Sequence, residues 1–186
     1  MTIQEDAIGE ITSFLEREAV PYMIIGGIAN LIWGEPRATL DVDVTVLVPP
    51  GAVEDFIASV AREYTILVSD PEQFVRDTRV LPASSRSGVR IDLIFGLLPF
   101  EEEAVRRAAS VEVAAGTIRV CSPEDLILMK IISERARDLD DARAITRRRL
   151  RTLDLLYLEP RIAEMSVLLE NDDIAARWAR WKAEAS

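Results

Sequence analysis

The sequence contains no histidine and a single cysteine, Cys121, among its 186 residues. These absences exclude a Ser-His-Asp triad, a Cys-His pair and a histidine- or cysteine-based zinc site within the chain. One cysteine cannot form a disulfide within the chain, which is typical of a reducing compartment, so we expect a cytoplasmic protein. Proton transfer and metal binding must therefore depend mainly on the 32 acidic residues.

Acidic residues outnumber basic ones, 32 to 22, so the formal net charge is −10, and only Lys130 and Lys182 of the basic residues are lysines. Non-specific binding of nucleic acid comes from neutralising phosphates, so we expect no binding to bulk DNA. A local basic run, residues 147–151, is the exception. Such runs are usually a solvated helix end, and contact with an RNA acceptor is the alternative.

Long apolar runs are missing as well, since none reaches the roughly 18 residues that suggest a membrane-spanning helix. The acidic N-terminus has no basic region of the kind that begins a signal peptide. We therefore expect no contact with a membrane.

Hydrophobic residues nevertheless make up 49% of the chain, enough for a substantial core. Apolar spacing and Gly/Pro positions predict an α/β (α+β) fold, with a small mixed β-sheet flanked by helices and a C-terminal helical bundle. We expect helices over residues 2–19, 28–33, 52–63 and 99–109. We expect strands over residues 22–25, 41–48, 64–68 and 89–95. A hairpin is expected over residues 111–120 and a loop over residues 82–88. We expect residues 1–120 to form the core, and residues 121–186 to form a helical region packed on it.

Two aspartates, Asp41 and Asp43, lie two positions apart in an expected strand. Side chains at this spacing point to the same face, and two neighbouring carboxylates repel each other. A divalent cation, a basic partner or exposure at a strand end must offset this repulsion.

A third aspartate, Asp92, lies in another apolar strand, where a single charge is unfavourable. It could form an ion pair with Arg90 or Arg37, or it could join Asp41 and Asp43 at a metal site. Three carboxylates suit Mg²⁺, which binds protein oxygens together with substrate phosphates. Two such ions could hold a triphosphate and lower the pKa of an attacking hydroxyl.

The pair Gly26-Gly27 follows an apolar run and precedes an expected helix. Glycines at this place allow backbone N–H groups to approach a phosphate, and a simple tight turn is the alternative. Arg37 and Thr39 lie in the segment that leads into the acidic strand. Arg37 could pair with a carboxylate or bind a phosphate.

The run from Ile25-Gly26-Gly27 through Asp41-Val42-Asp43 resembles the signature of the nucleotidyltransferase superfamily, which has the DNA polymerase β-like fold. Asp92 in RIDLIF matches the third carboxylate of that signature. The segment GGIANLIWGEPRATLDVDV is most similar to the AbiEii/MenT-like nucleotidyltransferases of toxin–antitoxin systems. A second stretch, Lys130 to Asp141, also resembles that group.

The resemblance implies that Asp41, Asp43 and Asp92 hold two Mg²⁺ ions, for which Mn²⁺ could substitute. It also implies that Gly26 and Gly27 line the triphosphate of ATP or another NTP. We count Arg37, Thr39 and Lys130 among the nucleotide-binding candidates. Lys130 would contact a nucleotide phosphate, and an ion pair with Glu134 is the alternative.

The expected reaction transfers an NMP from an NTP to an acceptor hydroxyl on tRNA, protein or a small molecule. The resemblance adds a cognate toxin or antitoxin as an expected partner. A non-catalytic binding module with the same fold, such as an antitoxin or a nucleotide sensor, is the first alternative. A structural domain whose acids are only edge charges is the second.

Overall fold

The computed structural model describes residues 2–36 and 38–185, and the chain divides into two units. The sheet unit comprises Met1–Ile28 and Ala38–Cys121, and the helical unit comprises Ala29–Arg37 and Ser122–Ser186. In the described ranges, no helix has both the length and the apolar character needed to cross a membrane.

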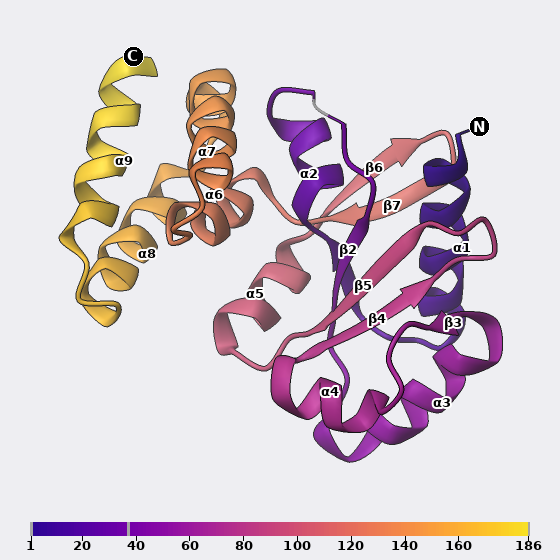
Figure 1. Cartoon of the computed structure of the whole chain (residues 1–186). Coiled ribbons are helices and arrows are strands. Elements are labelled where there is room, and N and C mark those ends of the chain that lie inside the picture. The colour runs from indigo at the N-terminus through magenta and orange to yellow at the C-terminus, as the bar shows by residue number, and fades with distance from the viewer. Residues whose placement is uncertain (1, 37, 186) are drawn as a thin grey trace. The chain divides into compact units, whose positions relative to one another are not determined.

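The sheet unit is built on one mixed sheet (Figure 1). Its strands are β1 (Tyr22–Ile24), β2 (Val42–Val46), β3 (Thr65–Ile66), β4 (Val80–Ser84), β5 (Arg90–Phe95), β6 (Ala109–Val113) and β7 (Gly116–Val120). The described residues form seven strands in the order β3-β4-β5-β2-β1-β7-β6. The pairs β2–β5 and β1–β7 are parallel, and the other neighbours are antiparallel.

Both units contain helices. Those of the sheet unit are α1 (Ile3–Arg17), η1 (Pro50–Ala52), α3 (Val53–Glu63), α4 (Pro71–Thr78) and α5 (Pro99–Arg107). The helix α2 (Gly26–Trp33) begins in the sheet unit, and its later residues belong to the helical unit. The helical unit also contains α6 (Pro123–Ile131), α7 (Ala136–Arg149), η2 (Leu150–Thr152), α8 (Leu155–Leu168) and α9 (Asp172–Ala185).

Aromatic contacts join helices to the sheet in the core of the sheet unit. The ring of Phe14 on α1 lies 5.5 Å from that of Tyr64 and 6.2 Å from that of Phe56 on α3. Phe56 in turn meets Phe95 of β5 edge to face at 5.8 Å. All four residues are buried, so this cluster anchors α1 and α3 to the strand that carries Asp92.

The predicted mixed sheet and C-terminal helices are confirmed, but several expected boundaries are wrong. The strand expected over 41–48 is shorter and begins at Val42, so Asp41 precedes it. The helix expected over 28–33 begins earlier, at Gly26. The expected loop 82–88 is partly strand, because β4 runs through Pro82. The carbonyl of Pro82 accepts from Leu67 N beside the short strand β3, so the missing N–H of the proline faces that edge and is tolerated there.

A buried ion-pair cluster lies inside the helical unit. The Nζ atom of Lys130 on α6 donates to Asp138 Oδ1 and Asp141 Oδ2 on α7, both at 2.8 Å. Asp138 Oδ2 also accepts from Ser133 Oγ and Arg135 Nε. The Lys130 side chain is only 6% exposed, so these carboxylates compensate the charge that burial would otherwise penalise.

The same cluster shifts the pKa of Asp138. Burial by itself would raise this pKa, but the hydrogen bond and charge of Lys130, with Ser133 and Arg135, outweigh burial and lower it. The ionised carboxylate is therefore the form that the folded helical unit stabilises.

We expect Lys130→Ala to lower the free energy of unfolding by about 3–5 kcal/mol, because it leaves two buried carboxylates without their ammonium partner. Urea unfolding at pH 7 measures this change. The matched control is Lys182→Ala, which removes the other lysine from a half-exposed pair with Glu159. That control should cost less than about 1 kcal/mol. Equal losses in the two variants would contradict a special role for the buried cluster.

The cost of Lys130→Ala should also depend on pH. The folded-state pKa of Asp138 lies below its ordinary value of 3.8, so its ion pair stabilises the fold above that value. This contribution is lost as the pH falls through the folded-state pKa. The difference in unfolding free energy between wild type and Lys130→Ala should therefore shrink when urea unfolding is repeated from pH 7 down to pH 3. A difference that stays constant with pH would contradict this account.

Candidate functional site

Two of the predicted aspartates are brought together by the parallel pairing of β2 and β5. Asp43 and Asp92 are direct partners in this register, and the flanking partners are Val42 with Ile91 and Val44 with Leu93. The four flanking side chains are fully buried, whereas both aspartates are partly exposed. The apolar neighbours fix the strands, so the two carboxylates start from adjacent positions on one sheet.

The third aspartate, Asp41, is exposed and precedes β2 by one residue. In residues 2–36 and 38–185, no group of three acidic or cysteine side chains is arranged to hold a metal ion. The structure therefore pairs Asp43 with Asp92 in register, and places Asp41 two positions before Asp43 without closing the predicted set of three.

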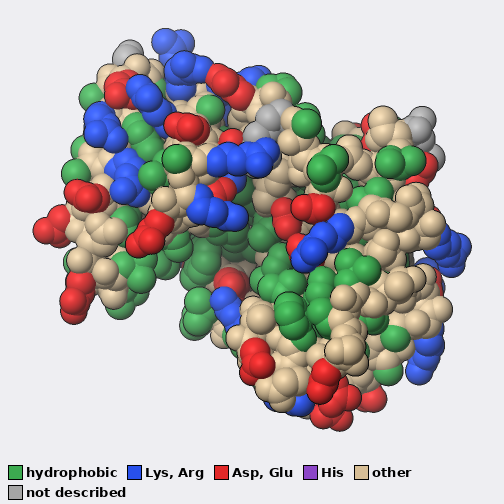
Figure 2. Space-filling model, in the orientation of Figure 1, with side chains coloured by type: hydrophobic (Ala, Val, Ile, Leu, Met, Phe, Trp, Pro, Cys, Tyr) green, Lys and Arg blue, Asp and Glu red, His purple; other side chains and the backbone are tan. Residues whose placement is uncertain are grey.

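The present partner of Asp92 is Arg90, two residues earlier on β5. Arg90 Nε lies 3.0 Å from Asp92 Oδ1 and 3.1 Å from Oδ2, so both carboxylate oxygens accept from one nitrogen. This is one of the two ion pairs that the sequence offered for Asp92. Figure 2 shows acidic and basic side chains next to each other over β2 and β5.

The charges of the other two aspartates also affect the pKa of Arg90. Its pKa is raised, first by the hydrogen bond to Asp92 and then by the charge of Asp92. Burial acts in the opposite direction, and the charges of Asp41 and Asp43 add to the rise. One guanidinium therefore lies in the electrostatic field of all three predicted carboxylates.

The two predicted glycines allow close packing beside these acids. Gly26 has a φ of +61°, which glycine adopts at little cost, and a Cβ there would lie 2.8 Å from Asp43 Cγ and closer still to Oδ2. A Cβ at Gly27 would lie 2.7 Å from the Cβ of Thr39. The first turn of α2 therefore packs directly against Asp43 and Thr39, which only glycine permits.

Backbone contacts hold the same region together. The N–H of Ile25 donates to the carbonyl of Asp43 at 2.9 Å. Thr39 Oγ1 donates to the carbonyl of Asp41 at 3.3 Å, and the carbonyl of Thr39 accepts from the side-chain amide of Gln4 on α1. Thr39 thus lies close to Asp41, and its role in nucleotide binding stays a prediction. No sequence pattern indicated Gln4, because a single glutamine that is distant in sequence from Thr39 belongs to no motif.

Two nucleotide-binding candidates remain, Lys130 and Arg37. Lys130 belongs to the helical unit, where its ammonium is hydrogen-bonded to Asp138 and Asp141, rather than to Glu134. Arg37 lies outside the described residues, so its expected contact with a carboxylate or phosphate stays a prediction.

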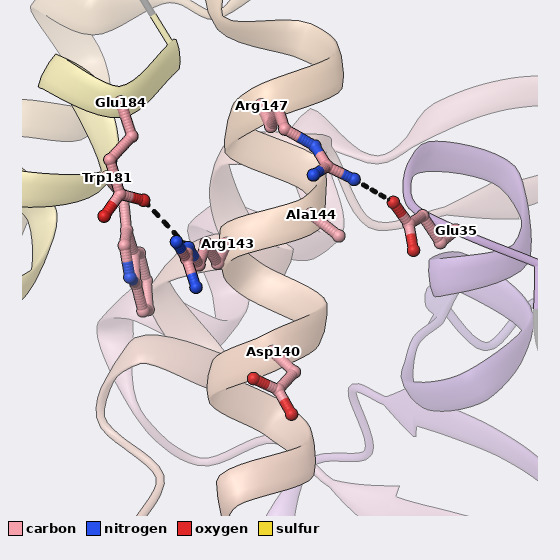
Figure 3. Close-up of a pocket in the computed structure, with 7 residues that line it drawn as sticks. All are labelled: Glu35, Asp140, Arg143, Ala144, Arg147, Trp181 and Glu184. Atoms are coloured by element: carbon pink, nitrogen blue, oxygen red, sulfur yellow. Dashed lines mark hydrogen bonds and ion pairs between the residues drawn. The ribbon is translucent and has the colours of Figure 1, made fainter.

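The helical unit has a cavity of its own, of about 380 Å³ (Figure 3). It is lined by Glu35, Asp140, Arg143, Ala144, Arg147, Trp181 and Glu184. Arg143 pairs with Glu184 at 2.8 Å, and Arg147, one helical turn further along α7, pairs with Glu35. The start of the basic run 147–151 thus forms an ion pair that stays within the helical unit.

The donor chemistry of the sheet unit fits magnesium. Mg²⁺ binds carboxylate oxygens and keeps several waters, so one or two protein carboxylates suffice for each ion. Asp43 and Asp92 supply such oxygens from adjacent positions, and Asp41 precedes β2 by one residue. A cation bound there would share the oxygens of Asp92 with Arg90, which contacts both of them.

Comparison with solved structures identifies the fold. The chain is similar to a nucleotidyltransferase-like protein from Paracoccidioides brasiliensis (TM-score 0.55, 16% identity, 93% of this chain and 90% of that one). It is similar to the antibiotic-resistance factor ANT(2'')-Ia (TM-score 0.60, 16% identity, 90% and 93%). It also resembles the lincosamide antibiotic adenylyltransferase LnuA (TM-score 0.52, 16% identity, 78% and 97%). At these identities the likeness defines the fold, which is that of the nucleotidyltransferases.

The family follows from the sequence match. Residues 4–177 match the family described as "Nucleotidyl transferase of unknown function (DUF2204)", and the chain belongs to this family. A search of the curated proteins found no match. The predicted superfamily is thereby confirmed, and the narrower resemblance to AbiEii/MenT-like proteins stays a prediction.

We expect Gly26→Ala to lower the free energy of unfolding by at least about 1–2 kcal/mol, because alanine is strained at this left-handed position and its Cβ overlaps the Asp43 carboxylate. Urea unfolding measures the loss. Gly51→Ala is the matched control, since a Cβ at Gly51 meets open space. It should change stability by no more than about 0.5 kcal/mol.

The double variant Gly26→Ala/Asp43→Ala separates the two causes. Compared with Asp43→Ala alone, it keeps the positive φ but has no carboxylate to overlap, so Gly26→Ala should cost less in this background than in wild type. If Gly26→Ala costs as much in the Asp43→Ala background as in wild type, overlap with the carboxylate contributes nothing.

Proposed function

We propose that this protein transfers an NMP from an NTP to an acceptor hydroxyl in a Mg²⁺-dependent reaction. The observation that carries the proposal is the register of Asp43 opposite Asp92 on two parallel strands, with the Gly26 backbone packed against Asp43. Membership in a nucleotidyltransferase family supports the same reaction class.

The sheet unit would bind the triphosphate and the metal. Asp41, Asp43 and Asp92 would be the ligands of two Mg²⁺ ions. When bound, these ions supply Lewis-acid stabilisation of the phosphoryl oxygens and lower the pKa of the acceptor hydroxyl. The backbone N–H groups of Gly26 and Gly27 would face the phosphates, because no side chain separates them from the acids and α2 adds its positive N-terminal dipole.

In the proposed reaction the acceptor oxygen attacks the α-phosphorus in line with the bond to the β-phosphate. That bond breaks with its electron pair on the leaving oxygen, so pyrophosphate departs, and the proton of the acceptor hydroxyl passes to water. Asp92 would orient the attacking hydroxyl. Lys130 has a structural role in this proposal, because two buried carboxylates already bind its ammonium.

The acceptor classes are tRNA, protein and small molecules. Excess acidic charge disfavours a large nucleic acid but leaves a tRNA end as a candidate. Two proteins of similar fold are, by name, an antibiotic-resistance factor and an antibiotic adenylyltransferase. Small molecules are therefore included among the acceptors to be tested. The resemblance to toxin–antitoxin nucleotidyltransferases adds a cognate partner protein.

One observation favours a second function, that of a non-catalytic nucleotide-binding module. The pair between Arg90 and Asp92 balances a carboxylate without any metal. A nucleotide sensor or antitoxin could retain such a pair permanently. Turnover distinguishes this module from an enzyme.

We expect the wild-type protein to transfer label from at least one α-³²P-labelled NTP, in the presence of Mg²⁺, to tRNA, protein or small molecules of a cell extract. Asp43→Asn should reduce this transfer about 100-fold or more, because it weakens binding of an ion that supplies several kcal/mol of stabilisation. The matched control, Asp55→Asn, changes an exposed aspartate of α3 and should retain activity.

The size and the nuclease or protease sensitivity of the product would identify the acceptor class. Folded wild-type protein that binds nucleotide yet labels none of the three acceptor pools would favour the binding module. Equal activity in Asp43→Asn and wild type would contradict the proposed site.

A further inference from the structure

Arg90 and Asp92 occupy one face of β5 at alternate positions, so their side chains lie side by side. The guanidinium is about half exposed, at 51%, whereas the carboxylate is 19% exposed. Arg90 is therefore the more exposed partner and contacts Asp92 from the solvent side. Its Nε contacts both oxygens of Asp92, which are the oxygens that a divalent cation would need.

The charges around Arg90 explain why it lies there. Asp43 and Asp92 begin from paired positions on β2 and β5, and Asp41 is two residues before Asp43. Three carboxylates at this spacing repel one another unless a cation is close. Arg90 supplies a cation at Asp92, where its Nε contacts both carboxylate oxygens.

We propose that Arg90 is a tethered counter-ion that competes with a divalent cation for Asp92. The proposal rests on the proposed function, since it assumes that the aspartates bind metal. The guanidinium and the cation use the same carboxylate oxygens, so binding of one opposes binding of the other by an equal free energy. Because the guanidinium is exposed and its pair is weak, a cation can displace it at a modest loss of affinity.

This competition makes Arg90 a residue that tunes metal affinity while stabilising the acids before the metal arrives. Removing its charge should tighten metal binding, although it removes an attractive contact from the fold. A merely structural ion pair would have the opposite signature, because its loss would disturb the site and weaken metal binding or leave it unchanged.

The test measures Mn²⁺ binding directly, by electron paramagnetic resonance of the free ion, for wild type, Arg90→Gln and Arg90→Lys. Arg90→Gln should bind Mn²⁺ about two- to fivefold more tightly than wild type, the range that an exposed ion pair of this kind permits. Arg90→Lys keeps the charge without the planar guanidinium and should lie between them. The matched control is Arg62→Gln, which removes an exposed arginine of α3 and should bind like wild type.

A second measurement follows the melting temperature with chelator and with Mn²⁺. Arg90→Gln should melt below wild type in chelator and show the larger rise when Mn²⁺ is added, because the ion replaces the lost positive charge. If Arg90→Gln does not fold, Arg90→Lys carries both measurements, with the same direction expected.

The outcomes separate this inference from the proposed function. Mn²⁺ binding of equal or lower affinity in the Arg90 variants would overturn the competition and leave the metal-dependent reaction intact. Absence of Mn²⁺ binding in wild type and all variants would overturn both. Tighter binding in Arg90→Gln, with no change in Arg62→Gln, would establish the competition.

Discussion

Repulsion between carboxylates held side by side on parallel strands is the constraint on which the sheet unit depends. The apolar partners around Asp43 and Asp92 prevent the strands from shifting, so the acids cannot separate. Their charge must be compensated locally, and Arg90 compensates that of Asp92 in this structure. Gly26 is a consequence of the same arrangement, because any side chain at that position would overlap the carboxylate of Asp43.

The helical unit also contains a cluster of charges, but there the cation is buried. There a single ammonium, that of Lys130, is buried and two carboxylates surround it. The two clusters differ in accessibility, and this difference separates their roles. A buried ion pair is costly to break and suits a structural position, whereas a half-exposed pair can be exchanged for another cation.

Much of this could be predicted from the sequence. Alternation of aspartate with valine identified a strand with acids on one face, and the Gly-Gly pair and Asp92 completed a recognisable signature. The boundaries of the elements were predicted less accurately. Pro82, which was expected in a loop, lies within β4, because the hydrogen bond on the side of β3 uses its carbonyl and not the absent N–H. The partner of Lys130 was also missed, because Glu134 is closer in sequence but Asp138 and Asp141 lie closer in space.

The sequence by itself predicted most of the strands and helices, because their periodicity depends on neighbouring residues, and its resemblance to a known signature indicated the superfamily. Tertiary structure decided the rest. The register of β2 against β5 places Asp43 opposite Asp92, and no sequence rule sets the pairing of strands that are about fifty residues apart. The choice of Arg90 as the partner of Asp92, and the burial of Lys130, likewise depend on where folding places each charge relative to water and to the other charges.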